Sequence, residues 1–211
     1  MIRDRVFRTA ALFVSAIGFV LGAAPAALAA DGATIVEQQC SICHGKDGAS
    51  GDSSIPVIGG YSVKYIVESI KNFKSKLRPC AEVTVQSGSK KGTRSDMCKV
   101  VAELSAADAE AAARYLASKP FVRVKQPFDA GKAARGEPVY KKNCKTCHEN
   151  NGSSRDEDNG ILAGQWTPYL KAQLTSFRAG KRVMDEKMEF RLVKVRPDEE
   201  EALLNFFASQ Q

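Results

Sequence analysis

The sequence predicts an all-α protein built from two tandem modules of similar length. Two observations support this fold class. The chain repeats itself at an offset of 104 residues, from Cys40 to Cys144, and no gap is needed as far as Phe73. The apolar residues of each copy recur at helical spacing after helix-capping residues, and no stretch alternates convincingly as a strand. We expect domains at residues 31–119 and 132–211, joined by a linker at 120–131.

The first thirty residues (1–30) have the features of a cleaved export signal. Three arginines precede an apolar run over 10–21, and Ala27-Leu28-Ala29 supplies a small-x-small cleavage site. The run is short for a membrane span and no second one follows, although an uncleaved anchor is the alternative. We therefore expect a periplasmic protein that has no stable membrane span after cleavage.

Each copy contains a CxxCH pentapeptide, which in an exported protein is the attachment site of a c-type haem. The two cysteines form thioethers with the vinyl groups of the porphyrin, and the adjacent histidine reaches the iron. The chain has only 2 histidines, and both belong to these motifs. The sequence therefore predicts two covalently bound haem c groups. Their attachment residues are Cys40, Cys43, Cys144 and Cys147, and their proximal iron ligands are His44 and His148.

Short helices are expected to lead into the two motifs, around residues 34–39 and 137–143. Ser62 can cap the central helix of the first module, whose apolar positions follow the helical period. In the second module Thr167 is the expected cap and Pro168 the first helical residue.

The first module contains an insertion. Near the end of the modules the offset falls from 104 to 91, which leaves the first module thirteen residues longer. Cys80 and Cys98 bracket this excess, which we place at about 78–98. In an oxidising compartment this pair predicts a disulfide, and closing such a loop is worth about 3 kcal/mol. The alternative is that Cys98 is a thiolate iron ligand or a reactive thiol.

The last helices are expected to start at Ser105, with Asp108 completing a capping box, and at Pro197. The linker between the modules lacks helical periodicity but contains Phe121 and Phe128. We expect it to lie along the domain interface.

A haem that transfers electrons needs a second axial ligand. With both histidines assigned, the candidates after the signal are Met97, Met184 and Met188. At the offset of 91, Met97 aligns with Met188. We predict Met97 as the ligand of the first haem and Met188 as that of the second, with Met184 in reserve. The alternative for any methionine is core packing.

Three aromatic residues can hydrogen-bond haem propionates through their polar edges, or simply pack in the core. They are Tyr65, Tyr169 and Trp166.

Tandem modules with a CxxCH motif, a later methionine and an aromatic-rich final helix resemble the diheme cytochrome c family. Residues 161–170 (ILAGQWTPYL) and 206–211 (FFASQQ) are most similar to the cytochrome subunit of flavocytochrome c sulfide dehydrogenase, and the spacing of Met184 and Met188 also fits. The resemblance implies class I cytochrome c-like domains, His/Met-ligated haems and electron acceptance from a flavoprotein that oxidises sulfide. The first module departs from that subunit in its insertion and extra cysteine pair.

The leading hypothesis is an electron-transfer protein and not an enzyme. It would accept electrons from a flavoprotein (FAD) dehydrogenase and pass them to another cytochrome or an oxidase. The alternative is a diheme enzyme of the thiosulfate-oxidising or peroxidase type, with one open or Cys-ligated haem. A zinc module that uses both CxxC pairs is a third hypothesis. Removal of three arginines and one aspartate lowers the formal charge from +7 to +5, and nothing indicates a nucleic-acid partner.

Overall fold

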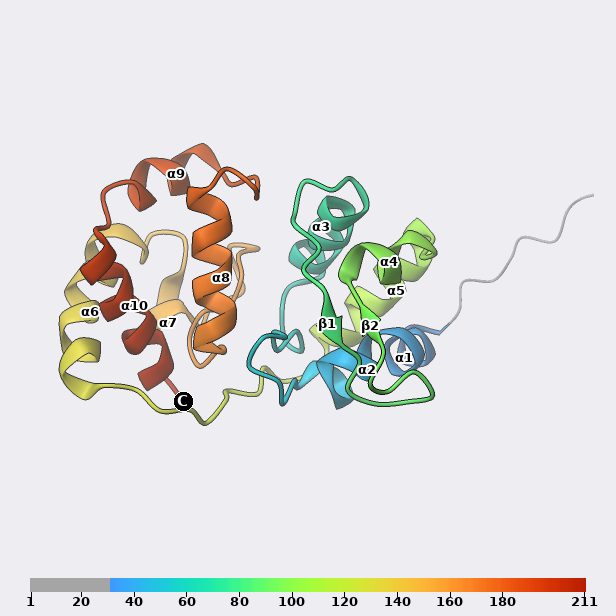
Figure 1. Cartoon of the computed structure of the whole chain (residues 1–211). Coiled ribbons are helices and arrows are strands. Elements are labelled where there is room, and N and C mark those ends of the chain that lie inside the picture. Colours follow the sequence, from blue (N-terminus) through green and yellow to red (C-terminus); the bar gives the residue numbers. More distant parts are fainter. Residues whose placement is uncertain (1–30) are drawn as a thin grey trace, which may run out of the picture.

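The structure is a computed structural model that describes residues 31–211, so the expected export signal lies outside the described residues. The chain forms two mostly helical domains that lie side by side and are joined by an extended segment (Figure 1). Within residues 31–211, no helix is long and apolar enough to cross a membrane.

The elements follow one another in the same general order in both domains. The first domain contains α1 (Gly32–Ile35), the π-helix η1 (Val36–Cys40), α2 (Ser41–His44), the 3-10 helix η2 (Lys46–Gly48), α3 (Val63–Lys74), β1 (Val83–Thr84), β2 (Arg94–Ser95), α4 (Met97–Ala102) and α5 (Ala106–Ala117). The second contains α6 (Ala130–Asn143), α7 (Glu149–Gly152), α8 (Thr167–Arg178), α9 (Glu186–Leu192) and α10 (Pro197–Ser209).

In each domain the first and last helices pack together, and a glycine lies where they meet. Gly32 on α1 lies against the carbonyl group of Ala111 on α5, and Gly136 on α6 lies against that of Ala202 on α10. A β-carbon at either glycine would overlap the carbonyl oxygen, so only glycine allows this approach. The two glycines are related by the offset of 104, which extends the repeat ahead of the CxxCH motifs.

Each domain has its own apolar core. The first core lies between α1, α3 and α5. The second is rich in aromatic residues: Tyr140 stacks on Phe206 with ring centroids 5.0 Å apart and meets Phe207 edge-on at 6.0 Å. Ile161 of the second domain packs into the first core, so the two cores meet at the domain interface.

Several predicted helix starts are confirmed. The hydroxyl of Ser62 accepts a hydrogen bond from the backbone N–H of Tyr65 at 3.1 Å and caps α3. Ser105 and Asp108 form the predicted capping box of α5, and α10 begins at Pro197. These caps satisfy backbone donors that have no partner within the helix, which is why local sequence specifies them.

The start of α8 differs from the prediction by one residue. Trp166 is its N-cap and Thr167 its first residue, so Pro168 occupies the second helical position. The hydroxyl of Thr167 therefore caps nothing; it is buried and has no hydrogen-bond partner among the described residues.

The helices that lead into the CxxCH motifs are longer than predicted. Helical structure runs from Gly32 through the first motif to His44. α6 starts at Ala130 instead of residue 137, because the side chain of Asp129 accepts a hydrogen bond from the backbone N–H of Lys132 at 2.8 Å. Packing against α10 stabilises a glycine-containing helix that local propensity alone disfavours.

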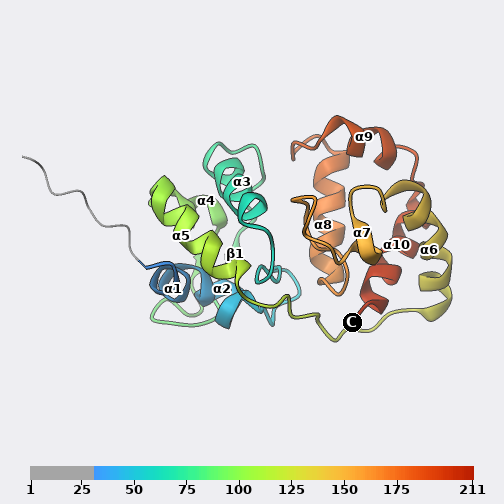
Figure 2. The ribbon, with the colours of Figure 1, turned by 180° about the vertical axis from the view of Figure 1, so that it is seen from behind.

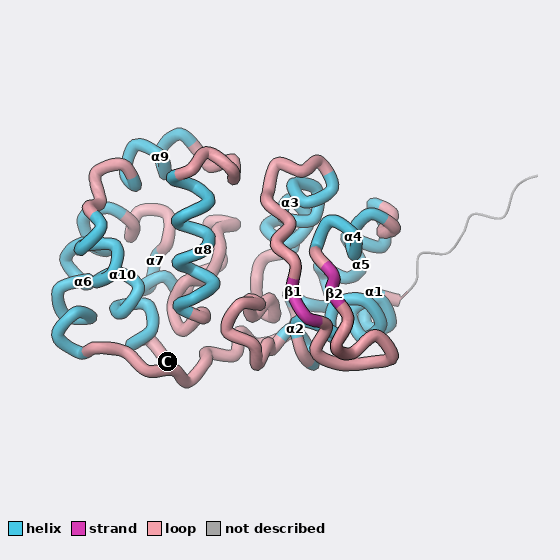
Figure 3. Tube along the Cα trace, in the orientation of Figure 1, coloured by secondary structure: helices cyan, strands magenta, loops and turns pink. Residues whose placement is uncertain are grey.

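The insertion contains a short antiparallel hairpin, which Figure 3 shows in magenta. Val83 of β1 lies opposite Ser95 of β2. The prediction that no stretch forms a strand is therefore wrong at this point. Strands of two residues are too short to show an alternating pattern in the sequence.

The segment between the domains lies along their interface. The ring of Phe121 packs 5.9 Å from that of Tyr61 in the first domain. Further on, the backbone N–H of Val124 donates to the carbonyl oxygen of Gly164 at 2.9 Å. This segment therefore contacts both domains and limits their relative movement.

Candidate haem sites and the domain interface

The first CxxCH motif spans the end of η1 and all of α2. Cys40 and Cys43 are half-buried and do not form a disulfide with each other. The ring of His44 is buried, and its Nδ1 atom lies 2.9 Å from the carbonyl oxygen of Pro56. A carbonyl oxygen only accepts hydrogen bonds, so Nδ1 carries the proton and Nε2 has a free lone pair.

The second motif lies in turns after α6 and its histidine is half-buried, but the imidazole is oriented in the same way. The Nδ1 atom of His148 lies 3.2 Å from the carbonyl oxygen of Gly160. In both motifs the acceptor follows its histidine by 12 residues. Burial is the main cause that lowers the pKa of both imidazoles, which keeps them neutral. A neutral histidine whose Nδ1–H is fixed by a carbonyl oxygen presents Nε2 as a metal ligand.

This geometry fits covalent haem better than zinc. Burial, followed by the neighbouring cysteine of each pair, raises the pKa of Cys40 and of Cys144 to about 11. A structural zinc site instead needs four ligands drawn together around one ion. The two pairs also lie in different domains, each directly before its own histidine in the sequence. The donor set therefore matches two separate haem attachment sites.

The predicted methionines occupy comparable positions in the two domains. Met97 is the first residue of α4, half-buried, and packs against the first core together with Cys40. Met188 lies within α9, and it precedes the N-cap of α10, Arg196, by the same eight residues that separate Met97 from Ser105. Met184 lies in the loop before α9 and is also half-buried.

Cys80 and Cys98 form a disulfide, with their Cα atoms 5.7 Å apart. The disulfide connects the start of the insertion to α4, one residue after Met97. The carboxylate of Asp96 lies close to the two sulfur atoms, but bonded sulfurs are not metal ligands, and Asp96 instead caps α4. A disulfide sulfur is also unavailable as a thiolate ligand to iron.

Helices α3 and α8 face each other across the domain interface in both views (Figure 1, Figure 2). All three predicted aromatic residues contact the opposite domain there. Tyr65 is on α3 and Tyr169 on α8. The indole N–H of Trp166 donates to the backbone carbonyl oxygen of Ser50 in the first domain at 3.0 Å. Because an indole has only this donor, Trp166 connects the domains and has no second polar hydrogen for a propionate.

Hydrogen bonds at the interface reflect the repeat. The hydroxyl of Tyr61 donates to the carbonyl oxygen of Ile161 at 3.3 Å, and the Nε2 atom of Gln165 donates to that of Val57 at 2.9 Å. The offset of 104 relates Tyr61 to Gln165 and Val57 to Ile161. Each domain thus presents equivalent positions to the other, which indicates an approximate two-fold relationship across the interface.

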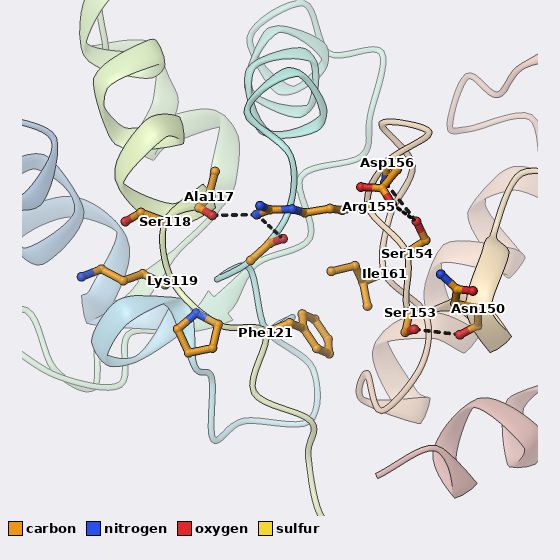
Figure 4. A pocket seen from close by; sticks show the side chains of 12 residues that line it. Ala117, Ser118, Lys119, Phe121, Asn150, Ser153, Ser154, Arg155, Asp156 and Ile161 are labelled. Atoms are coloured by element: carbon orange, nitrogen blue, oxygen red, sulfur yellow. Dashed lines mark hydrogen bonds between the residues drawn. The ribbon is translucent and has the colours of Figure 1, made fainter.

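A second contact between the domains borders an open cavity of about 650 Å³. Figure 4 shows Arg155 reaching from the second domain to the first. Its Nη1 atom donates to the carbonyl oxygen of Ala117 at 2.7 Å and to that of Gly60 at 3.3 Å. We assign this cavity no ligand, because its described lining already pairs the arginine with backbone oxygens.

Sequence reasoning missed several residues that build the sites. Pro56 and Gly160 orient the histidines, and Arg78 is a buried arginine at the interface. The offset of 104 pairs these positions as well, because Pro56 aligns with Gly160 and Arg78 with Arg182. The two arginines could have been found from the repeat. Pro56 and Gly160 could not, because they are unlike residues that act through their backbone oxygens.

Comparison with known proteins gives a consistent result. The family model "Cytochrome c" matches residues 29–119, and "Cytochrome C oxidase, cbb3-type, subunit III" matches residues 131–204. The chain is 31% identical over 156 residues to cytochrome c4 of Azotobacter vinelandii, which covers 69% of this chain and 70% of that protein.

Solved structures are similar over most of the chain. Reduced recombinant cytochrome c4 from Pseudomonas stutzeri has a TM-score of 0.68 and 25% identity, covering 85% of this chain and 97% of that one. Thiosulfate dehydrogenase from Marichromatium purpuratum has a TM-score of 0.67 and 23% identity, covering 85% of this chain and 40% of that one. The second likeness shows the fold alone.

Proposed function

Because this chain belongs to the cytochrome c4 family of diheme electron carriers, we propose that it accepts electrons from a periplasmic flavoprotein dehydrogenase and passes them to another cytochrome or an oxidase. Its two cytochrome c domains carry two covalent haem c groups. The bound haems supply one-electron redox chemistry. The equivalent orientation of His44 and His148 is the observation that supports two similar centres.

We assign the ligands residue by residue. Covalent attachment falls to the four cysteines of the CxxCH motifs, which are Cys40, Cys43, Cys144 and Cys147. His44 and His148 are the proximal ligands, since their Nδ1 atoms face carbonyl oxygens and Nε2 is free. Met97 and Met188 are the distal ligands. Each precedes the N-cap of its domain's last helix by the same number of residues in the sequence, which supports this pair over Met184.

The assignment of a flavoprotein donor of the sulfide dehydrogenase type rests on sequence resemblance in the second module alone. The relatives reported above support a carrier and do not identify its donor. A periplasmic location rests on the N-terminal segment, which lies outside the described residues. The thiosulfate-oxidising alternative needs an open or Cys-ligated haem. Cys98 was the candidate for such a thiolate ligand, and its sulfur is bonded to that of Cys80 in the disulfide.

The test combines haem content with electron acceptance. The purified chain should contain two covalent haems, and Cys147→Ser should lose one of them, whereas the double variant Cys80→Ser/Cys98→Ser should keep both. Mixed with a sulfide-oxidising flavoprotein, the chain should be reduced only when both sulfide and the flavoprotein are present. Equal reduction rates with and without the flavoprotein would exclude this protein as the donor. The proposed carrier function would not be affected by that result.

A further inference from the structure

The insertion of the first domain forms a hairpin whose loop lies against the first CxxCH motif. Figure 3 shows the loop between the two magenta strands passing beside α2. At its base, the backbone N–H of Val85 donates to the carbonyl oxygen of Thr93 at 2.9 Å. The side chain of Val85 is buried, so this base is anchored in the domain. We call the intervening residues 86–92 the hairpin tip.

The hairpin tip is bonded to the haem-attachment motif itself. The backbone N–H groups of Gln86 and Ser87 both donate to the carbonyl oxygen of Ile42, at 2.9 Å and 3.0 Å. Ile42 lies between the two cysteines of the motif. A β-carbon at Gly88 would stand 3.2 Å from the side chain of Ile42. The side chain of Gln86 also donates to the carboxylate of Asp52 at 2.9 Å. These contacts hold the tip beside the residues that attach the first haem.

The other end of the hairpin lies beside the proposed distal ligand. β2 ends at Ser95, two residues before Met97, and the disulfide between Cys80 and Cys98 fixes this end. The two axial ligands of a haem iron lie on opposite faces of the porphyrin. A hairpin that runs from Met97 to Ile42 therefore has to pass the rim of the first haem, on the side of its thioether bonds.

The second domain lacks this insertion, and its attachment motif is more open. The segment from the central helix to the predicted methionine spans residues 75–96 in the first domain but only 179–187 in the second. Cys147 is exposed, whereas Cys43, which aligns with it, is half-buried. The two attachment sites therefore differ in how much polypeptide covers them.

We propose that the hairpin tip covers the thioether rim of the first haem, so that the chain exchanges electrons with its partners through the second haem. This inference rests on the proposed function, which supplies both haems and the donor. Electron transfer slows steeply with the distance between redox groups, so a layer of polypeptide over one haem favours the other. The donor reduces the ferric second haem by one electron, and that haem is reoxidised when the electron passes to the ferric first haem.

The first test measures the access of solvent to each haem in the reduced diheme protein. A neutral gadolinium chelate broadens the NMR signals of protons that it can approach, and the thioether protons are assigned through their contacts with Cys43 and Cys147. In the unsubstituted protein, the signals of the second haem should broaden several-fold more than those of the first. Equal broadening of the two haems would overturn the inference, and this measurement needs no variant to fold.

The second test replaces residues 86–92 by Asn-Gly, which forms the tight turn that joins two paired strands. This variant keeps Val85, both strands and the disulfide. The signals of its first haem should broaden as much as those of the second. The rate constant for its reduction by reduced riboflavin should rise toward double, because both haems then accept electrons directly. An unchanged rate in a variant whose first haem has become accessible would contradict the proposed electron route.

The matched control is the double variant Lys90→Gln/Lys91→Gln, which removes two charges of the tip and keeps its polypeptide. The broadening of its first haem should equal that of the unsubstituted protein. If this variant instead behaves like the shortened hairpin, charge and not coverage separates the two haems, and the inference is wrong. In each of these cases the carrier function stands. A chain without two covalent haems would contradict the proposed function itself.

Discussion

Gln165 of the second domain bonds both backbone groups of Val57 in the first: its Oε1 accepts from the N–H at 3.0 Å and its Nε2 donates to the carbonyl oxygen at 2.9 Å. Its Nε2 also lies 3.0 Å from the hydroxyl of Tyr61. The side chain is fully buried. One amide therefore satisfies three polar groups of the first domain across the interface.

Gln165→Ala should destabilise the protein by about 2–3 kcal/mol, because it leaves buried donors and acceptors of Val57 without partners. The free energy of unfolding in guanidinium chloride measures this loss. Gln86→Ala is the control, since Gln86 is exposed in the insertion. Equal stability of the two variants would show that Gln165 does not hold the interface.

Gly136→Ala should also destabilise the protein, by about 1–3 kcal/mol, because the new methyl group forces α6 away from α10. Gly51→Ala is the matched control, since a β-carbon at Gly51 meets no atom within 4 Å. Urea denaturation of both variants measures the difference. A neutral Gly136→Ala variant would contradict the close helix crossing.

The methionine assignment predicts a stepwise change in the optical spectrum. Methionine-ligated ferric haem has a weak far-red charge-transfer band. Met97→Ala and Met188→Ala should each remove about half of it, because each haem loses one axial thioether. Met184→Ala should leave the band unchanged and serves as the control. Loss of the band in Met184→Ala instead of Met188→Ala would assign Met184 to the second iron.

The disulfide should stabilise the first domain by about 3 kcal/mol, because it closes a loop in the unfolded chain. The double variant Cys80→Ser/Cys98→Ser is expected to lose this amount in chemical denaturation. It should also weaken the far-red band of the first haem, since Cys98 follows Met97 at the start of α4. The contribution of the second haem is the internal control. An unchanged stability would contradict the predicted role of the loop closure.

Acid should weaken the contact between η2 and α5. A hydrogen bond from the hydroxyl of Tyr115 at 2.8 Å, and then the charges of Lys119 and Lys46, lower the pKa of Asp47. A carboxyl whose pKa is lower in the folded state stabilises the fold above its unfolded pKa of about 3.9, and the benefit is lost as the pH falls through the folded value.

Asp47→Asn tests this pH dependence, because asparagine also tolerates the positive φ of this position (55°). Its free energy of unfolding should fall less than that of the unsubstituted protein as the pH is lowered below about 4. Parallel pH profiles of the two proteins would show that Asp47 does not contribute.

The local parts of the fold could be predicted from the sequence. Ser62 and Ser105 mark the starts of α3 and α5 because a cap acts on backbone groups only three residues away. The early start of α6 could not be read this way, since its stability comes from packing against α10. The hairpin at Val83 was missed because its strands are too short for a pattern.

The sequence alone determined the haem motifs, the internal repeat and the cysteine pair, because covalent attachment and disulfide formation depend on residue type and spacing. Only the tertiary structure showed what surrounds them. The carbonyl oxygens of Pro56 and Gly160 orient the histidines, and backbone atoms leave no signature in side-chain identity. The meeting of Arg78 with Tyr169 also needs the interface, since these residues lie 91 positions apart and only the packing of the two domains brings the charge and the hydroxyl together.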